Sequence, residues 1–239
     1  MKISCIQNNV GFGRALTTKE KKSYEKIQAE ARKQLGLDKT TATIFDFSIP
    51  TTDSKSDSGI GTTFSDDAQK LAGMLKTMCG VNSIQLQPQG QISNFIRSPY
   101  SGTSFSLGYH IIDLTKLKTP EYGTLLNDKD LNDSFISQNE NHAFVDYDNV
   151  FTNDNQKTML KKAYVNFKKT SSDTKIKKEF ETFKKENSYW LERDALFEAA
   201  AADNGSEDIK NWSYRDQNVF ASRNGNKERI AELKKVQDN

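Results

Sequence analysis

The chain has few residues of the kinds that bind metals or form disulfides. Its 239 residues include two cysteines and two histidines. Cys5 and Cys79 do not form a metal-type or redox-type pair, and His110 and His142 each lack neighbouring ligands at metal-binding spacing. The sequence therefore predicts neither a disulfide framework nor a metal site, and a reducing, cytoplasmic location is expected.

Long apolar segments and a strong charge of one sign are also lacking. No stretch approaches the ~20 apolar residues that a membrane helix needs, and the N-terminal segment lacks the apolar run of a signal peptide. Lysine and arginine number 34 against 32 acids, a net charge of +2. This balance gives no electrostatic reason to expect nucleic acid or an anionic membrane as a partner.

Aromatic residues are plentiful although the chain is polar. The mean hydropathy is -0.76, yet 14 Phe, 8 Tyr and 2 Trp supply the bulky apolar surface that a disordered chain lacks. We therefore expect a folded protein with a polar surface. Between Lys157 and Lys185 there are ten lysines and three acids. This run is most simply a solvated helical surface, and a docking face for an acidic partner is the alternative.

The first 90 residues alternate between helical and strand patterns. Helices are predicted over residues 17–35 and from Ser65 to a stop at Gly80, each with a capping residue ahead of apolar residues at helical spacing. Strands are predicted over residues 41–50 and 82–88. The order helix, strand, helix, strand is typical of βα units with a parallel sheet.

This alternation ends at Gly90. A long irregular stretch follows, interrupted by a short strand-like segment, YHIIDL, at residues 109–114. Apolar residues at helical spacing then return at residues 160–167, 176–191 and 230–236. The second part of the chain is therefore predicted to be mainly helical.

The motifs of several enzyme classes are missing. There is no Gly-x-Ser-x-Gly elbow and no phosphate-binding loop, and the Gly-Ile-Gly at residues 59–61 is too short to bind a dinucleotide. Glycoside chemistry requires two carboxylates beside a sugar. Among the acids, Asp46 follows a predicted strand, where barrel enzymes place functional residues, although a loop or capping role is the simpler interpretation.

The segment RSPYSGTSF, residues 97–105, combines a stiff Pro-Tyr pair with several hydroxyl residues. Pro99 restricts the backbone beside Tyr100. The ring of Tyr100 offers an aromatic face to a sugar, and the serines offer hydrogen bonds to its hydroxyl groups. From this chemistry alone an ordinary turn is the simpler interpretation, and a sugar contact is the alternative.

The order of motifs from Gly59 to Trp212 resembles that of the 4-α-glucanotransferases, family 77 of the glycoside hydrolases. In that family a Gly-Ile-Gly loop precedes a helix, Ser-Pro-Tyr-Ser leads to a Leu-Ile-Asp-Leu segment, and Val-Asp-Tyr is followed by a lysine-rich helix. The corresponding segments here are GIG, SPYS, IIDL, VDY and NSYWLERDALFEA.

The resemblance implies an α/β fold, the N-terminal part of a (β/α)8 TIM-type barrel with a large, mainly helical insertion after its second strand. Residues 1–90 would start the barrel, residues 91–225 would form the insertion, and residues 226–239 would be a truncated helix leading back to the barrel.

The resemblance also implies a function in α-1,4-glucan metabolism (maltodextrin, starch or glycogen). The family transfers glycosyl groups between glucan chains with retention, through an aspartate intermediate and without a metal or organic cofactor. By resemblance, Ser98, Pro99 and Tyr100 bind the glucan. The family's nucleophile, acid/base and third-acid motifs do not occur in this sequence, so the chain is expected to be inactive alone. The alternative is a non-catalytic glucan-binding or protein-interaction module derived from the same fold.

Overall fold

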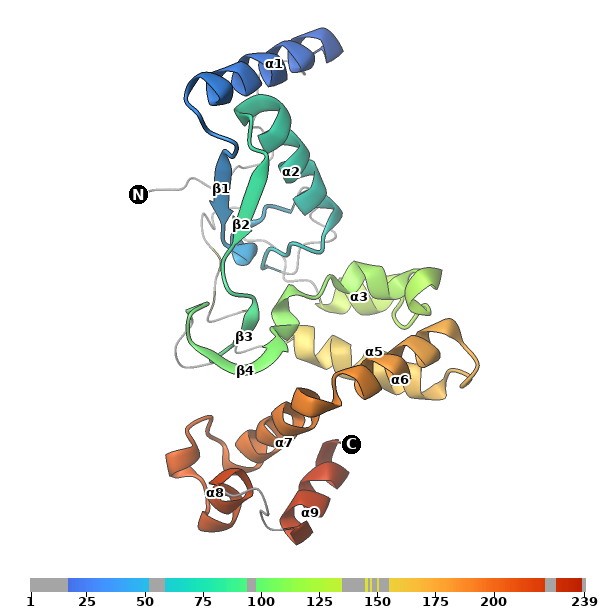
Figure 1. Cartoon of the computed structure of the whole chain (residues 1–239). Coiled ribbons are helices and arrows are strands. Elements are labelled where there is room, and N and C mark those ends of the chain that lie inside the picture. The colour runs from blue at the N-terminus through green and yellow to red at the C-terminus, as the bar shows by residue number, and fades with distance from the viewer. Residues whose placement is uncertain are drawn as a thin grey trace. The chain divides into compact units, whose positions relative to one another are not determined.

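A computed structural model describes residues 17–51, 59–93, 98–134, 145, 147, 150, 155–221 and 227–237. The chain divides into two compact units. The first consists of Met1–Gln89 and Tyr109–Thr170, and the second of Gly90–Gly108 and Ser171–Asn239. The elements are labelled in chain order in Figure 1.

The first unit begins with the predicted helix, strand, helix, strand order. Helix α1 spans Thr18–Gln34 and α2 spans Asp66–Cys79, while β1 (Thr41–Ile44) and β2 (Ser83–Leu86) pair in parallel. The two helices are joined by a hydrogen bond, 2.7 Å long, from the Arg32 guanidinium to the carbonyl oxygen of Gly80. The described residues thus confirm a parallel strand pair, and they do not form a closed barrel.

The first strand is shorter than predicted, because it ends at Ile44 and a 3-10 turn, η1 (Asp46–Ser48), follows. The chain turns there to pack against the loop of Gly59, Ile60 and Gly61. The backbone N–H of Gly61 donates to the carbonyl oxygen of Phe47 at 3.1 Å, and a Cβ on Gly61 would lie 2.3 Å from the Ile49 carbonyl oxygen. Glycine is therefore required at this close approach.

Helix α2 carries the expected signals at both ends. The Ser65 hydroxyl accepts a hydrogen bond from the backbone N–H of Ala68 at 3.1 Å, and Asp66 and Asp67 occupy the positive end of the helix dipole. Gly80 terminates the helix with a φ of 65°. These local signals explain why the sequence predicted the bounds of α2 closely.

Replacing Ser65 with alanine is expected to lower the free energy of unfolding by about 1 kcal/mol, because the Ala68 N–H loses its partner. The effect is measured by thermal unfolding, with circular dichroism as the signal. Ser65→Asp, which keeps an acceptor oxygen at the cap, is the control and should stay close to the wild type. Equal losses in the two variants would contradict a capping role.

The described residues in the rest of the first unit form short helical turns and two helices. These are η3 (Tyr109–Ile111), η4 (Leu114–Lys118), η5 (Pro120–Tyr122), α3 (Asp128–Ser134) and α5 (Asn155–Lys169). The strand predicted at residues 109–114 was wrong, since this segment forms 3-10 turns. The carboxylate of Asp113 accepts a hydrogen bond from the backbone N–H of Thr115 at 2.9 Å and so begins η4. Ile111 and Leu114 are buried three residues apart, which suits a turn better than a strand.

The second unit begins with an antiparallel hairpin of β3 (Gly90–Ile92) and β4 (Gly102–Leu107), in which Gly90 lies opposite Leu107. The sequence predicted an irregular stretch here, so the hairpin is a correction. Half of β4 is glycine or serine, which lack the β-branched or aromatic side chains that favour strands. The pairing with β3 is therefore decided by tertiary contacts.

The described remainder of this unit is mainly helical: α6 (Lys175–Glu186), α7 (Ser188–Asn204), the turn η6 (Ile209–Asn211), α8 (Tyr214–Ala221) and α9 (Lys227–Gln237). The single helical pattern at residues 176–191 is in fact interrupted at Asn187. The Asn187 side-chain amide donates to the Phe183 carbonyl oxygen at 2.9 Å, and its oxygen accepts from the Trp190 indole at 3.0 Å. Asparagine thus ends α6 and begins α7.

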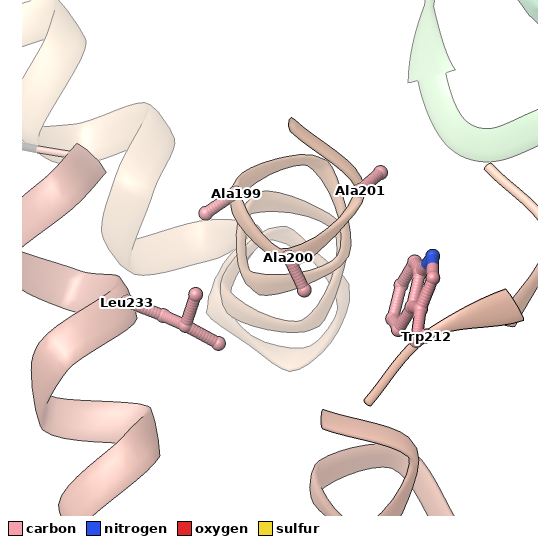
Figure 2. Close-up of a cluster of buried hydrophobic side chains, with 5 residues drawn as sticks. All are labelled: Ala199, Ala200, Ala201, Trp212 and Leu233. Atoms are coloured by element: carbon pink, nitrogen blue, oxygen red, sulfur yellow. The ribbon is translucent and has the colours of Figure 1, made fainter. Parts of the chain in front are cut away.

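The core of this unit gathers around the alanine-rich end of α7. Figure 2 shows Ala199, Ala200 and Ala201 on α7, with Leu233 directed toward one side of the helix and Trp212 beside another. Ala200 and Leu233 are both completely buried. Small side chains on α7 let α9 approach closely, so this end of α7 is the centre of the unit.

Within the part of the chain that the structure describes, no helix is both long enough and apolar enough to cross a membrane.

Candidate functional site

The Ser98-Pro99-Tyr100 segment forms a β-turn between the two strands of the hairpin. The backbone N–H of Ser101 donates to the Ser98 carbonyl oxygen at 3.0 Å, and the Tyr100 N–H lies 3.3 Å from the Ser98 hydroxyl oxygen. Proline suits the second position of such a turn because its φ is already set. The structure thus contains the predicted turn and brings the three residues together.

Tyr100 projects from this turn into solvent, with 74% of its surface exposed. Ser98 and Pro99 are partly exposed beside it. An accessible aromatic ring next to hydroxyl groups can stack on the apolar face of a sugar and can hydrogen-bond its hydroxyl groups. The turn is therefore a surface on which a polyhydroxylated ligand can be held.

The hairpin that carries the turn is anchored at its other end to α7. The backbone N–H of Ser106 on β4 donates to the Asp194 carboxylate at 2.9 Å, and Asp194 is buried. At the turn end, the Ser93 N–H lies 3.4 Å from the Ser101 carbonyl oxygen. Sequence reasoning did not identify Asp194 as an anchor, because its partner lies 88 residues away in the chain.

Asp46, the acid that follows the first strand, is 3% exposed. Burial raises the pKa of its carboxyl group, and a hydrogen bond with Gln89 opposes that rise. Among the described residues its Oδ1 atom has no hydrogen-bond partner. The Gln89 amide also donates to the Thr63 hydroxyl at 2.9 Å. This polar cluster closes the carboxyl end of the β1 and β2 pair, and a buried acid there is not accessible to attack a large substrate.

The side chain of His110 is only 2% exposed and lies against the ring of Tyr109, with ring centroids 3.9 Å apart and ring planes tilted by 33°. Burial, assisted by the positive charge of Lys157, lowers the pKa of His110 to about 4. His142 and Cys5 lie outside the described residues, and Cys79 is an exposed free thiol. In the described ranges no group of three His, Cys, Asp or Glu side chains could hold a metal ion.

The lysine-rich run is divided between α5 and α6. Lys162 on α5 pairs with the buried Asp130, and on α6 Lys184 pairs with Glu181 at 3.1 Å. The run therefore includes lysines that already have acidic partners within the chain. A role in docking an acidic partner stays a prediction.

A group that the sequence did not indicate surrounds Arg229 on α9. Its guanidinium contacts Asp203 of α7, Asp216 of α8 and Glu232 of α9. Asn204 donates to the Asp216 carboxylate at 2.8 Å. Because these acids lie on separate helices, only the folded chain brings them together, and the result is an ionic connection among three helices.

Comparison with known proteins identifies the family. A family model described as 4-alpha-glucanotransferase matches residues 47–238. No curated protein matches the chain. The match begins after β1 and includes β2, the hairpin of β3 and β4, the exposed Tyr100 turn and the described helices from α2 to α9. The chain belongs to the 4-alpha-glucanotransferase family.

Proposed function

We propose that this chain binds α-1,4-glucan at the Ser98-Pro99-Tyr100 turn as part of a 4-α-glucanotransferase reaction. The observation that carries the proposal is the exposed Tyr100 ring on a hydrogen-bonded, hydroxyl-rich turn in a chain of this family. The family's chemistry requires a glucan to be held while its glycosyl group is transferred. A surface that stacks on a sugar ring supplies that part of the function.

The catalytic carboxylates are not assigned to residues of this chain. Retaining transfer needs a nucleophile and an acid/base about 5 Å apart beside the sugar. Asp46 is buried at the end of β1, and the sequence contains none of the motifs that the resemblance associates with the family's catalytic acids. We therefore propose that the 239-residue chain binds glucan without transferring it. A non-catalytic glucan-binding module would share this behaviour.

The test combines binding and turnover in the purified chain. Isothermal titration calorimetry is expected to detect binding of maltohexaose. After incubation with maltotriose, neither longer nor shorter sugars are expected to appear. Tyr100→Ala should weaken binding roughly tenfold or more, because the stacking face is lost. Tyr214→Ala is the matched control, since Tyr214 on α8 is 80% exposed.

Two results would contradict the proposal. If wild type and Tyr100→Ala bound maltohexaose with equal affinity, the turn would not be part of the binding site. Disproportionation of maltotriose by the pure chain would show that catalytic carboxylates are present after all.

A further inference from the structure

Helix α5 carries positive charge and no negative charge. Its 15 residues contain no aspartate or glutamate and include five lysines: Lys157, Lys161, Lys162, Lys168 and Lys169. Helix α6, in the second unit, also has five lysines, but three glutamates are interspersed among them. The charge of the lysine-rich run is therefore concentrated on α5. It produces a local positive field, although the charges of the whole chain nearly balance.

Three of these lysines and one tyrosine form a stripe along the exposed side of α5. The members are four, three and four residues apart in sequence, which places them on one face of the helix: Lys157, Lys161, Tyr164 and Lys168. All four are exposed. On the other side of the helix Ala163 and Phe167 are buried. The α5 lysine stripe is roughly 16 Å long, from the rise per residue of a helix.

Aromatic rings support the lysines at both ends of the stripe. The Nζ atom of Lys157 lies 5.7 Å from the centroid of the Tyr109 ring, and that of Lys168 lies 5.0 Å from the centroid of the Tyr164 ring. Contacts between a cation and an aromatic face hold a long side chain in place. The charges at the ends of the stripe are therefore positioned before a partner arrives, which reduces the conformational entropy lost on binding.

The stability of α5 does not account for the lysines in its first half. Cations are favourable at the C-terminal end of a helix, where Lys168 lies. Lys157 lies in the first turn, at the positive end of the helix dipole, and that turn contains no acid. Lys157 and Lys161 are also four residues apart, a spacing at which like charges repel each other. An interaction outside the helix explains these two positions better than helix formation does.

Among anionic partners, the structure favours a short acidic segment of a protein. Ala163 and Phe167, on the apolar side of α5, are buried, so that side is not available to insert into a membrane. The net charge of +2 gives the chain little attraction for a long nucleic acid, which extends beyond one helix. Helix α3, which packs against α5 (Figure 1), also presents the exposed carboxylate of Asp128. An extended peptide needs only about five residues to span the stripe.

We propose that the α5 lysine stripe is a docking site for an acidic segment of another protein, whose carboxylates pair with Lys157, Lys161 and Lys168. Because the lysines are exposed, each ion pair is weak and is screened by salt. The interaction is therefore transient and depends on several pairs together. It is independent of the glucan site proposed above.

The experiment measures the binding of fluorescein-labelled hexaglutamate to the 239-residue chain by fluorescence anisotropy, with hexaglutamine as the neutral control. Only hexaglutamate is expected to bind at about 0.01 M salt. Its affinity should fall at least tenfold at about 0.15 M salt, where the Debye length shortens from about 30 Å to about 8 Å. Lys161→Gln combined with Lys168→Gln should weaken binding about fivefold, because two ion pairs are lost.

Lys178→Gln combined with Lys185→Gln is the matched control, since it removes the same charge from exposed positions on α6. It should change the affinity for hexaglutamate by less than about twofold. Circular dichroism checks that both double variants are folded. Equal losses in the two would show that the peptide responds to total charge, and the assignment to α5 would be wrong.

Three other results would overturn the proposal. The first is an absence of hexaglutamate binding at low salt. The second is tighter binding of a single-stranded DNA hexamer that the α5 double variant also weakens, which would make the partner a nucleic acid. The third is binding to phosphatidylserine vesicles in preference to hexaglutamate, which would make the stripe a membrane contact.

Discussion

Replacing Arg229 with methionine is expected to lower the free energy of unfolding of the second unit by about 3–5 kcal/mol, because it leaves the buried Asp216 carboxylate without its positively charged partner. The Arg229 Nε atom donates to Asp216 Oδ1 at 2.6 Å, and only 12% of the arginine side chain and 4% of the aspartate side chain are exposed. The same guanidinium contacts Asp203 and Glu232. Its removal therefore disconnects α7, α8 and α9 at one point.

The chain provides both a specific probe and a matched control for this measurement. The two tryptophans, Trp190 and Trp212, both lie in the second unit, so urea unfolding followed by tryptophan fluorescence reports on that unit. Arg215→Met removes an ion pair with Glu232 in which both side chains are nearly half exposed. Exposed pairs contribute about 0–1 kcal/mol, so this variant should lose little. Equal losses in the two variants would contradict a structural role for Arg229.

The same network makes the second unit sensitive to acid. The hydrogen bond from Arg229 is the main reason that the pKa of Asp216 lies below its ordinary value of 3.8. The folded carboxylate therefore binds a proton less readily than the unfolded one. This contribution to stability is complete above pH 3.8 and is lost as the pH falls through the lower, folded pKa. The acid sensitivity should be reduced in Arg229→Met.

His110 is expected to titrate at about pH 4 and to make the first unit less stable as the pH falls from 6.5 toward that value. Burial is the larger cause of the lowered pKa, and the positive charge of Lys157 adds to it. Over this interval the unfolded histidine binds a proton and the folded one does not. The free energy of unfolding therefore falls by roughly 3 kcal/mol from this group.

Nuclear magnetic resonance can measure this pKa directly, because the chain has only two histidines. His110→Gln assigns the imidazole resonances, and the His110 resonance should then titrate at about pH 4. Lys157→Gln should raise that pKa only slightly, because burial remains. A His110 resonance that titrates near pH 6.5 would show that the side chain is open to water.

Local signals predicted the elements whose ends are determined by neighbouring residues. The Ser65 cap and the Gly80 stop enclose α2 because capping bonds involve residues only a few positions apart. The β-branched run at residues 41–44 likewise became β1, parallel to β2. The exposed Ser98–Ser101 turn belongs to the same class, since proline and serine determine its geometry locally.

Segments with weak local preference were the ones predicted wrongly. Residues 109–114 form a short apolar run, for which strand and helical turn cannot be separated by periodicity alone. β4 has a glycine and two serines among its six residues, and it becomes a strand because β3 and Asp194 take part of its backbone hydrogen bonding. The helical pattern across Asn187 continues in sequence, but the asparagine side chain bonds to both flanking helices and separates them.

By itself the sequence determined the family, the helix caps and the turn with Tyr100, because each depends on residue types in short, recognisable motifs. It also predicted the parallel strand pair, from the order in which helical and strand patterns alternate. Only the tertiary structure decided that His110 and Asp46 are buried, that Asp194 holds the hairpin, and that Arg229 joins three helices. Those properties depend on partners far apart in the chain, and the free energy of burying or pairing a charge is defined only once folding has brought the partners together.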